Sequence, residues 1–368
     1  MWVIFGHASS AKCGRVVADA IKAVLFSSFR GFYISSSRSS DILLHSLHTG
    51  PFYRLHPRLP HHHVNPIMKV FVTGATGFLG SAVTRTLLAH GHTVVALARS
   101  PTSANKVKVF GASPLIGNLT DLALLTKAAE DCDAVIHTAF HHDFLSPSYD
   151  FPAAAREDRE ALQALVDGVR GTNKPIVAAN GLPGGKPNTI LLETDEKGPG
   201  PRTGAEELFK KAAGEGVRGI TIRLGPSVHG DGDYAFIPTL IDGARKNGFA
   251  MYVDENAFWS PVHRDDAAEL FRLAIEKDLP GGTVLHGAED SACNTKNIAE
   301  VIARKVGVEV KQVTKQEAMG LYGFIGMAFG TYLVGSNELT KKLTGWEVQQ
   351  KGLLADLEEG TYFSTPGV

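Results

Sequence analysis

Short apolar runs alternate with amphipathic segments along most of the chain, starting at residue 70. The runs are continuous in apolar residues, which is typical of strands buried on both faces. They predict strands at 70–73, 93–98, 114–116, 134–139, 175–179 and 219–224. The segments between them place apolar residues on one face and predict helices at 81–90, 120–129, 152–168 and 204–213. This order predicts an α/β fold with a doubly wound parallel sheet.

After Gly225 the pattern loosens, and the predicted elements are farther apart. Helices are expected at 237–246, 265–277 and 294–305, and strands at 283–286 and 308–313. Asp265 or Asp266 is the expected N-cap of the helix at 265–277. From residue 68 onward we therefore expect two parts, a dinucleotide-binding domain at 68–235 and a smaller, substrate-binding C-terminal part at 236–368.

Residues 1–67 differ in composition from the rest of the chain. They hold seven Lys and Arg against two acids, a charge of +5, which leaves −6 for residues 68–368. An Arg- and Ser-rich, acid-poor segment resembles an organelle transit peptide. Two other interpretations stay open, a segment outside the mature protein and an ordered element. We expect the segment to be disordered, because it lacks periodic apolar segments long enough to pack, and we expect the fold to begin with the strand after Met68. His61–His63 stand in a Pro-flanked stretch and are expected to be incidental.

The bulk composition excludes several functions. The chain has 368 residues, 43% of them hydrophobic, and a net charge of −1 without a basic stripe, so nucleic acid is not an expected partner. Cys13, Cys132 and Cys293 are too widely spaced for a disulfide framework or zinc site, which favours a reducing compartment. No apolar run approaches the roughly 20 residues of a membrane span. We expect a cytoplasmic monomer or homodimer without metal, or a mitochondrial protein if residues 1–67 are a transit peptide.

The most informative motif is Gly74-x-x-Gly77-x-x-Gly80, between the first predicted strand and the first predicted helix. Glycines at these positions permit a tight turn, close approach of a pyrophosphate, and packing of helix on strand. The N-terminus of the helix adds N–H groups and a partial positive charge for phosphates. The context of the three glycines predicts a dinucleotide-binding turn.

These residues resemble the short-chain dehydrogenase/reductase superfamily, in its extended or atypical branch, which includes the NAD-dependent epimerases/dehydratases. Four later segments resemble that branch in the same order: His137-Thr138-Ala139, Arg223 to Gly230, Val262 to Ala268, and Leu343 to Trp346. The resemblance implies a Rossmann fold over about residues 68–363. It also implies a nicotinamide cofactor and a small-molecule substrate, without naming that substrate.

The chain departs from the family at the catalytic pair. In that superfamily a Tyr-x-x-x-Lys pair carries proton transfer, but none of the eight tyrosines here has lysine four residues later. An ungapped count places Gly198 at the tyrosine position and Arg202 at the lysine position. Asn180 falls near the position of the family's serine. The sequence thus resembles the atypical members that lack the usual pair.

Two hypotheses follow. In one, the protein is an oxidoreductase in which Arg202 holds the ribose and polarises a substrate oxygen, while a histidine transfers the proton. Five histidines lie near predicted strand ends or the substrate segment: His137, His141, His142, His229 and His263. The cluster His141-His142-Asp143 is the first to test, so the catalytic candidates are Arg202, Asn180 and His141. In the other hypothesis, the protein binds a dinucleotide without catalysis, as a redox-sensing or interaction protein.

The end of the second strand bears on cofactor choice. Arg99 stands where an acidic residue would select NAD, so it favours the 2′-phosphate of NADP, with NAD as the alternative. Asn118 stands where the family places an aspartate against adenine, and its amide can still pair there. The predicted cofactor-binding residues are Gly74, Thr76, Gly77, Phe78, Leu79, Gly80, Arg99, Asn118, Leu119, Thr138, Ala139 and Pro226.

The substrate-binding part is rich in large apolar residues. Phe236, Met251, Tyr252 and Trp259 favour a fairly apolar small molecule, although such residues also form ordinary cores.

Overall fold

The computed structural model describes residues 32–36, 42–46, 66–141, 150–184, 186–196 and 204–364. The chain divides into two compact units, residues 1–64 and 65–368. In the first unit, β1 (Phe32–Ser36) pairs antiparallel with β2 (Ile42–Ser46). All other elements described below belong to the second unit.

Residues 1–67 are expected to be dispensable for folding and cofactor binding. The first strand of the large sheet begins at Lys69, and the backbone N–H of Met68 donates to His92 Nδ1 at 3.1 Å. In a chain that starts at Met68, the terminal amino group can still donate this hydrogen bond to His92. It should express, fold and bind cofactor as the full chain does, which thermal melts and cofactor titrations can compare. Loss of solubility or of binding on truncation would contradict the expectation.

The second unit is built on a seven-stranded sheet in the order β13-β8-β7-β6-β3-β4-β5, and every neighbouring pair is parallel. This confirms the doubly wound fold expected from the sequence. The strands are β3 (Lys69–Thr73), β4 (Thr93–Ala98), β5 (Ser113–Ile116), β6 (Ala134–His137), β7 (Pro175–Gly181), β8 (Arg218–Leu224) and β13 (Thr283–Gly287).

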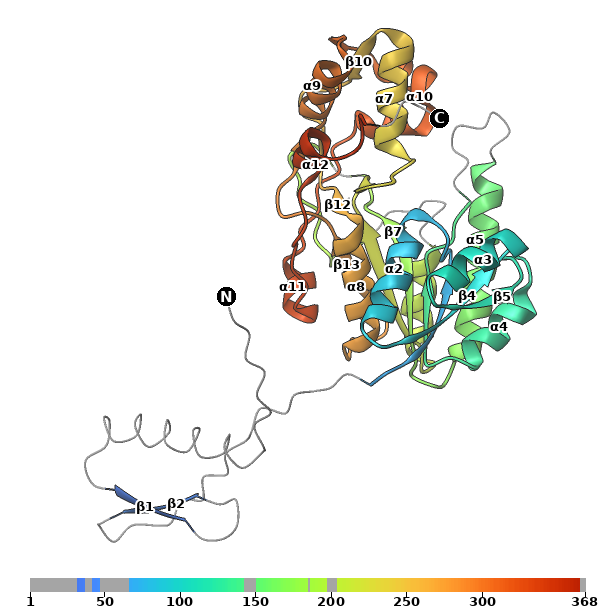
Figure 1. The fold of residues 1–368 in the computed structure, drawn as a ribbon, viewed down its shortest axis with the longest axis vertical. Coiled ribbons are helices and arrows are strands. Elements are labelled where there is room, and N and C mark those ends of the chain that lie inside the picture. The colour runs from blue at the N-terminus through green and yellow to red at the C-terminus, as the bar shows by residue number, and fades with distance from the viewer. Residues whose placement is uncertain are drawn as a thin grey trace, which may run out of the picture. The chain divides into compact units, whose positions relative to one another are not determined.

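Helices cover both faces of the sheet (Figure 1). One face packs against α2 (Phe78–Ala89), α3 (Pro101–Val109) and α8 (Arg264–Glu276). The other packs against α4 (Leu122–Glu130), α5 (Phe151–Val169) and α6 (Gly204–Ala213). Because successive residues of a strand point to opposite faces, Val70 and Val72 enter the first core and Phe71 the second.

Two details of this layer differ from the sequence predictions. Helix α3 was not predicted, because it buries few apolar side chains; Ser100 caps it by accepting from the Ser103 N–H at 3.1 Å. The N-cap of α8 is His263, not Asp265 or Asp266. Its imidazole accepts from the Asp265 N–H at 3.2 Å, so both aspartates fall in the first turn, where the helix dipole favours negative charge.

Six of the remaining C-terminal elements form a separate hydrophobic core. They are α7 (Phe236–Asn247), β10 (Phe249–Tyr252), α9 (Thr295–Val306), β15 (Glu309–Gln312), α10 (Lys315–Phe329) and α12 (Leu353–Glu359). Short strand pairs connect this core to the sheet layer: β9 (Val228–His229) with β12 (Val262–His263), and β11 (Phe258–Trp259) with β14 (Cys293–Asn294). The sequence had assigned α8 and β13 to the C-terminal part, but both pack in the sheet layer.

Candidate functional site

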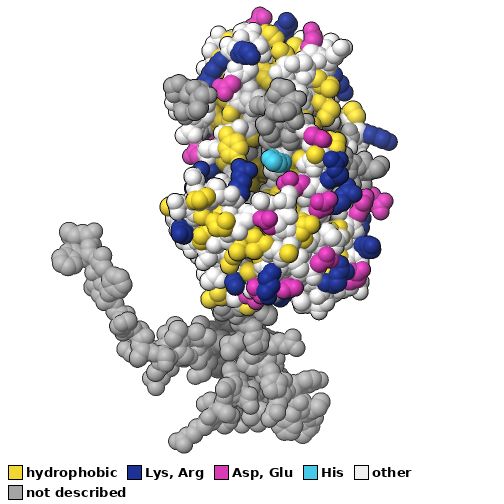
Figure 2. Space-filling model, turned by 90° about the vertical axis from the view of Figure 1, so that its right-hand side faces the viewer, with side chains coloured by type: hydrophobic (Ala, Val, Ile, Leu, Met, Phe, Trp, Pro, Cys, Tyr) yellow, Lys and Arg dark blue, Asp and Glu magenta, His cyan; other side chains and the backbone are white. Residues whose placement is uncertain are grey.

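The strand order reverses beside β3. From β3 the chain goes outward to β4 and β5, and it then returns to β6 on the other side. In open parallel sheets, ligands bind at the carboxyl ends of the strands at such a point. Here a cavity of about 1390 Å³ opens between this edge and the C-terminal elements. Figure 2 shows one face of the molecule, on which hydrophobic side chains lie in several patches with charges of both signs among them.

Gly74 and Gly80 are required by the fold of the turn. Gly74 has φ +76°, and a Cβ there would lie 2.7 Å from the Ala139 nitrogen. A Cβ at Gly80 would lie 2.1 Å from the Gly74 carbonyl oxygen. The Thr138 hydroxyl is close to both glycines and donates to the Thr73 carbonyl at 2.8 Å. The turn and the end of β6 are thus locked together without room for side chains.

Gly77 differs from the other two glycines. It is the N-cap of α2 with φ −78°, and a Cβ there would meet the Gly74 carbonyl oxygen at 3.2 Å and the Tyr234 hydroxyl at 3.9 Å. Tyr234 lies over the start of the helix, where its hydroxyl accepts from the Phe78 N–H at 3.4 Å. A bare glycine backbone and the N-terminus of α2 therefore border the cavity, an arrangement suited to a pyrophosphate.

The cavity brings together the residues that the sequence singled out. All twelve predicted cofactor-binding residues line it, and so do Asn180 and His141. Arg202, His142 and Asp143 lie outside the described residues. The predicted cofactor-binding residues that line it are Gly74, Thr76, Gly77, Phe78, Leu79, Gly80, Arg99, Asn118, Leu119, Thr138, Ala139 and Pro226.

Arg99 and Asn118 follow β4 and β5 on one side of the switch point. Arg99 is exposed and lines the cavity. The Asn118 side-chain oxygen already accepts from the Thr120 N–H at 2.8 Å and from the Thr120 hydroxyl. An adenine amino group would have to compete with these two bonds. The amide nitrogen of Asn118, a donor, is therefore better suited to contact a ring nitrogen of adenine than the oxygen is to accept from its amino group.

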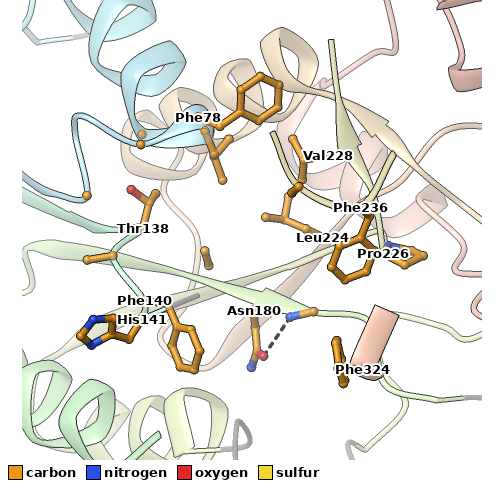
Figure 3. Close-up of a pocket in the computed structure, with 18 of the residues that line it drawn as sticks. Phe78, Thr138, Phe140, His141, Asn180, Leu224, Pro226, Val228, Phe236 and Phe324 are labelled. Carbon is orange, nitrogen blue, oxygen red and sulfur yellow. Dashed lines mark hydrogen bonds between the residues drawn. The ribbon is translucent and has the colours of Figure 1, made fainter. Parts of the chain in front are cut away.

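Asn180 and His141 lie on the other side of the switch point (Figure 3). Asn180 is buried near the end of β7, and its Oδ1 accepts from the Gly181 N–H at 2.9 Å. Because Oδ1 accepts from the backbone, a hydrogen bond between Asn180 and a ligand oxygen would be donated by the amide nitrogen. His141 follows β6, and its Nδ1 is 3.9 Å from Glu157 Oε1 on α5, another cavity residue that sequence reasoning missed. Glu157 thus lies within ion-pair distance of the imidazole, which can exchange a proton with a ligand in the cavity.

The other described histidine candidates have structural partners. His137 is buried between Thr73 Oγ1 at 2.8 Å and Asp158 Oδ1 at 3.0 Å. His229 contacts Glu289 and Asp356, and His263 caps α8. Among the described histidines, His141 is the one that lines the cavity.

Of the apolar residues expected to face a substrate, Phe236 lines the cavity, whereas Met251 and Trp259 are buried in the C-terminal core and Tyr252 packs against it. Ser227, Tyr234 and Phe324 also line the cavity and were not predicted. Ser227 directly follows Pro226 and could have been found from that neighbour. Phe324 gave no signal, because helix α10 itself was not predicted.

Within the described ranges, no helix is long and apolar enough to cross a bilayer. The same ranges contain no group of three or more His, Cys, Asp or Glu side chains arranged to hold a metal ion.

Comparison with known proteins gives consistent matches. Residues 70–170 match the family described as the NAD dependent epimerase/dehydratase family. An uncharacterized protein of Schizosaccharomyces pombe is 38% identical over 301 residues, which is 80% of this chain and 100% of the relative. A 4-hydroxy-2-methyl-3-oxo-4-farnesyl-3,4-dihydroquinoline-1-oxide ketoreductase of Stigmatella aurantiaca is 29% identical over 265 residues, 66% of this chain and 75% of the relative.

Among solved structures, MoeE5 in complex with UDP-glucuronic acid and NAD superposes with a TM-score of 0.64 at 22% identity. The match covers 80% of this chain and 98% of that one. At this identity the likeness concerns the fold.

Proposed function

Because the chain belongs to the NAD-dependent epimerase/dehydratase family of the short-chain dehydrogenase/reductase superfamily, we propose that it is an oxidoreductase that uses NADP(H) on a small carbonyl or alcohol substrate. The observation that carries the proposal is the glycine turn at the switch point, which opens into a cavity of about 1390 Å³. Ligand pockets are commonly about 300–1,000 Å³, so this one can hold a dinucleotide and a substrate together. The ketoreductase name of the Stigmatella relative supports a carbonyl substrate.

The residues around the cavity fit a nicotinamide dinucleotide. When bound, the reduced cofactor supplies a hydride to a carbonyl carbon while the carbonyl oxygen takes up a proton, which yields an alcohol and the oxidised cofactor. Gly77 and the N-terminus of α2 would hold the pyrophosphate. The Asn180 amide would donate a hydrogen bond to the substrate oxygen, and His141 would move the proton.

Oxidation of NADPH, followed at 340 nm with a panel of aldehydes and ketones, tests this function. Turnover with at least one compound is expected. A second candidate function, a non-catalytic NADP-binding redox sensor or interaction protein, is favoured by the missing Tyr-x-x-x-Lys pair. Tight NADPH binding without turnover of any carbonyl or alcohol would support that candidate instead.

NADPH is expected to bind more tightly than NADH, because Arg99 can pair with the 2′-phosphate. A charge-assisted hydrogen bond contributes about 1.5–3 kcal/mol. Arg99→Ala should therefore weaken NADPH by roughly tenfold or more and leave NADH nearly unchanged, as measured by fluorescence titration. Arg85→Ala is the matched control, since Arg85 on α2 stacks on Phe110 and does not line the cavity. Equal losses for both cofactors, or an NADH preference in the parent, would count against this role.

Arg202 is proposed to take part of the role of the family's lysine, because it stands at that position by ungapped count. Arg202→Ala should lose most turnover, since removal of one charge-assisted contact costs roughly 2–4 kcal/mol in the transition state. Arg202→Lys should retain cofactor binding. His141→Gln should lower kcat, because the proposed proton transfer needs the imidazole. Full activity of Arg202→Ala, or of His141→Gln, would refute this mechanism.

A further inference from the structure

Part of the cavity is walled by aromatic rings from four different elements. Phe140 follows β6, Phe151 begins α5, Phe236 begins α7 and Phe324 lies on α10. Ring centroids are 6.0 Å apart for Phe140 and Phe151, 6.4 Å for Phe151 and Phe324, and 6.2 Å for Phe324 and Phe236. We call these four residues the aromatic wall; Figure 3 shows Phe140, Phe236 and Phe324 around the cavity with Asn180.

The helix that carries Phe324 is kinked directly before it. Gly323 has φ 55° and ψ −131°, a conformation that favours glycine, and it interrupts α10. After the kink, Phe324 and Met327 line the cavity, yet 41% and 42% of their surfaces remain exposed. Large apolar side chains that stay wet at the mouth of a cavity gain free energy when an apolar ligand covers them.

Charged groups are scarce in this part of the cavity. Of the described lining residues, Arg99 and Glu157 are the ones of the Lys, Arg, Asp and Glu types. Arg99 follows β4, beyond β3 from the aromatic wall, and Glu157 is negative. Glu157, on the same helix as Phe151, would repel a diphosphate bound beside the wall.

Two buried polar side chains interrupt the apolar surroundings. Asn180 and Ser227 are 4% and 3% exposed, and both line the cavity. The Ser227 hydroxyl has no hydrogen-bond partner among the described residues. A buried hydroxyl without a partner is unfavourable, so a ligand atom at this place would be stabilised. The pair can serve a single oxygen or amide group of a ligand.

We propose that the aromatic wall binds the apolar body of an uncharged ketone or aldehyde with an aromatic or long alkyl group, rather than a nucleotide-diphosphate sugar. Asn180 and Ser227 supply the polar contacts of this site. The inference rests on the proposed oxidoreductase function, which provides the reduction of the carbonyl group to an alcohol.

NADPH-dependent reduction of a series of 2-alkanones from 2-butanone to 2-decanone, with 4-phenyl-2-butanone and UDP-glucose, tests the site. Each methylene buried on the wall should lower KM up to about fourfold, from about 0.8 kcal/mol per methylene. Phe324→Ala should raise KM for 2-decanone and 4-phenyl-2-butanone tenfold or more and change that for 2-butanone little. Met319→Ala is the matched control, since Met319 is 52% exposed on the same helix and does not line the cavity.

Saturation-transfer NMR with 4-phenyl-2-butanone and NADP⁺ measures binding without turnover. A signal that Phe324→Ala removes and UDP-glucose does not displace is expected. Binding without any reduction would keep the apolar site and refute the oxidoreductase. Reduction with KM independent of chain length and of Phe324, or reaction of UDP-glucose, would overturn the apolar site and keep the oxidoreductase. Absence of both binding and reduction would overturn both.

Discussion

Gly77→Val is expected to abolish dinucleotide binding while the chain stays folded. The backbone at Gly77, with φ −78° and ψ 174°, is extended and accepts a branched residue. The nearest protein atom to a Cβ there is the Gly74 carbonyl oxygen at 3.2 Å, so the new side chain fits the protein with a small shift. It would instead fill the space over the N-terminus of α2 that a pyrophosphate needs.

Thermal unfolding with and without NADPH decides this prediction. The variant should melt within a few degrees of the parent without cofactor, and NADPH should not raise its melting temperature. For the parent, NADPH at a hundredfold excess over Kd should raise the free energy of unfolding by about 2.7 kcal/mol. Gly214→Val is the matched control, because Gly214 is exposed, has no atom within 4 Å of a Cβ, and lies away from the cavity. A preserved cofactor shift in Gly77→Val would mean that the turn holds no pyrophosphate.

Gly80→Val separates the two roles of glycine in the same turn. A Cβ at Gly80 would lie 2.1 Å from the Gly74 carbonyl oxygen, so this variant should lose stability even without cofactor. The contrast between Gly77 and Gly80 distinguishes a glycine needed for a ligand from one needed for packing.

The sheet layer could be predicted from the sequence because its strands are buried on both faces and its helices on one. Residues 93–98 and 204–213 were predicted with the bounds of β4 and α6 as the structure has them. In each of these elements, the pattern of apolar residues along the segment itself indicates which side chains are buried. The helix α3 was missed because only Ala104 and Val107 of its residues are buried.

The C-terminal side of the cavity could not be predicted in this way. Helix α10 contains Gly320, Gly323 and Gly326, which disfavour a helix and hide its pattern. The aromatic wall joins residues from four elements, and each phenylalanine alone is an ordinary core residue. Trp259 and Met251 show the converse, since the sequence placed them at the substrate and the structure buries them in the core.

A second large effect is expected at His229, whose role the sequence left open. The imidazole is fully buried, with Nε2 2.7 Å from Glu289 Oε1 and Nδ1 2.9 Å from Asp356 Oδ2. These partners are 60 and 127 residues away in the chain, so no local pattern announces them. A neutral imidazole has one N–H and could donate to one carboxylate only. The geometry therefore favours the imidazolium, which donates to both.

His229→Phe should lower the free energy of unfolding by about 3–5 kcal/mol, as measured by urea denaturation. The variant keeps an aromatic ring at this position, but two buried carboxylates lose their shared counter-charge. Adding Glu289→Gln and Asp356→Asn to His229→Phe is the control, because neutral amides remove the uncompensated charge and should recover much of the loss. A His229→Phe protein as stable as the parent would mean that the three groups are not an ionic cluster.

The pH dependence of stability gives an independent check of the same cluster. Burial alone lowers the pKa of His229, but the hydrogen bonds to Asp356 and Glu289 outweigh it and raise the pKa above its usual 6.5. The stabilisation is then complete below pH 6.5 and is lost as the pH rises through the folded-state pKa. The parent should lose stability in that range, and His229→Phe should not.

Asp233, near the same cluster, falls in a different pH window. Burial raises its pKa from 3.8 to about 6. Asp233 therefore lowers the free energy of unfolding as the pH rises from 3.8 to about 6. The Tyr362 hydroxyl donates to Asp233 at 3.0 Å and accepts from the Gly230 N–H at 3.1 Å. These two bonds fix the loop on which Tyr234 follows Asp233. A slope of the free energy of unfolding against pH above 6.5 reports on His229 rather than on Asp233. If the parent and His229→Phe show equal slopes above pH 6.5, the imidazole is neutral in the folded protein.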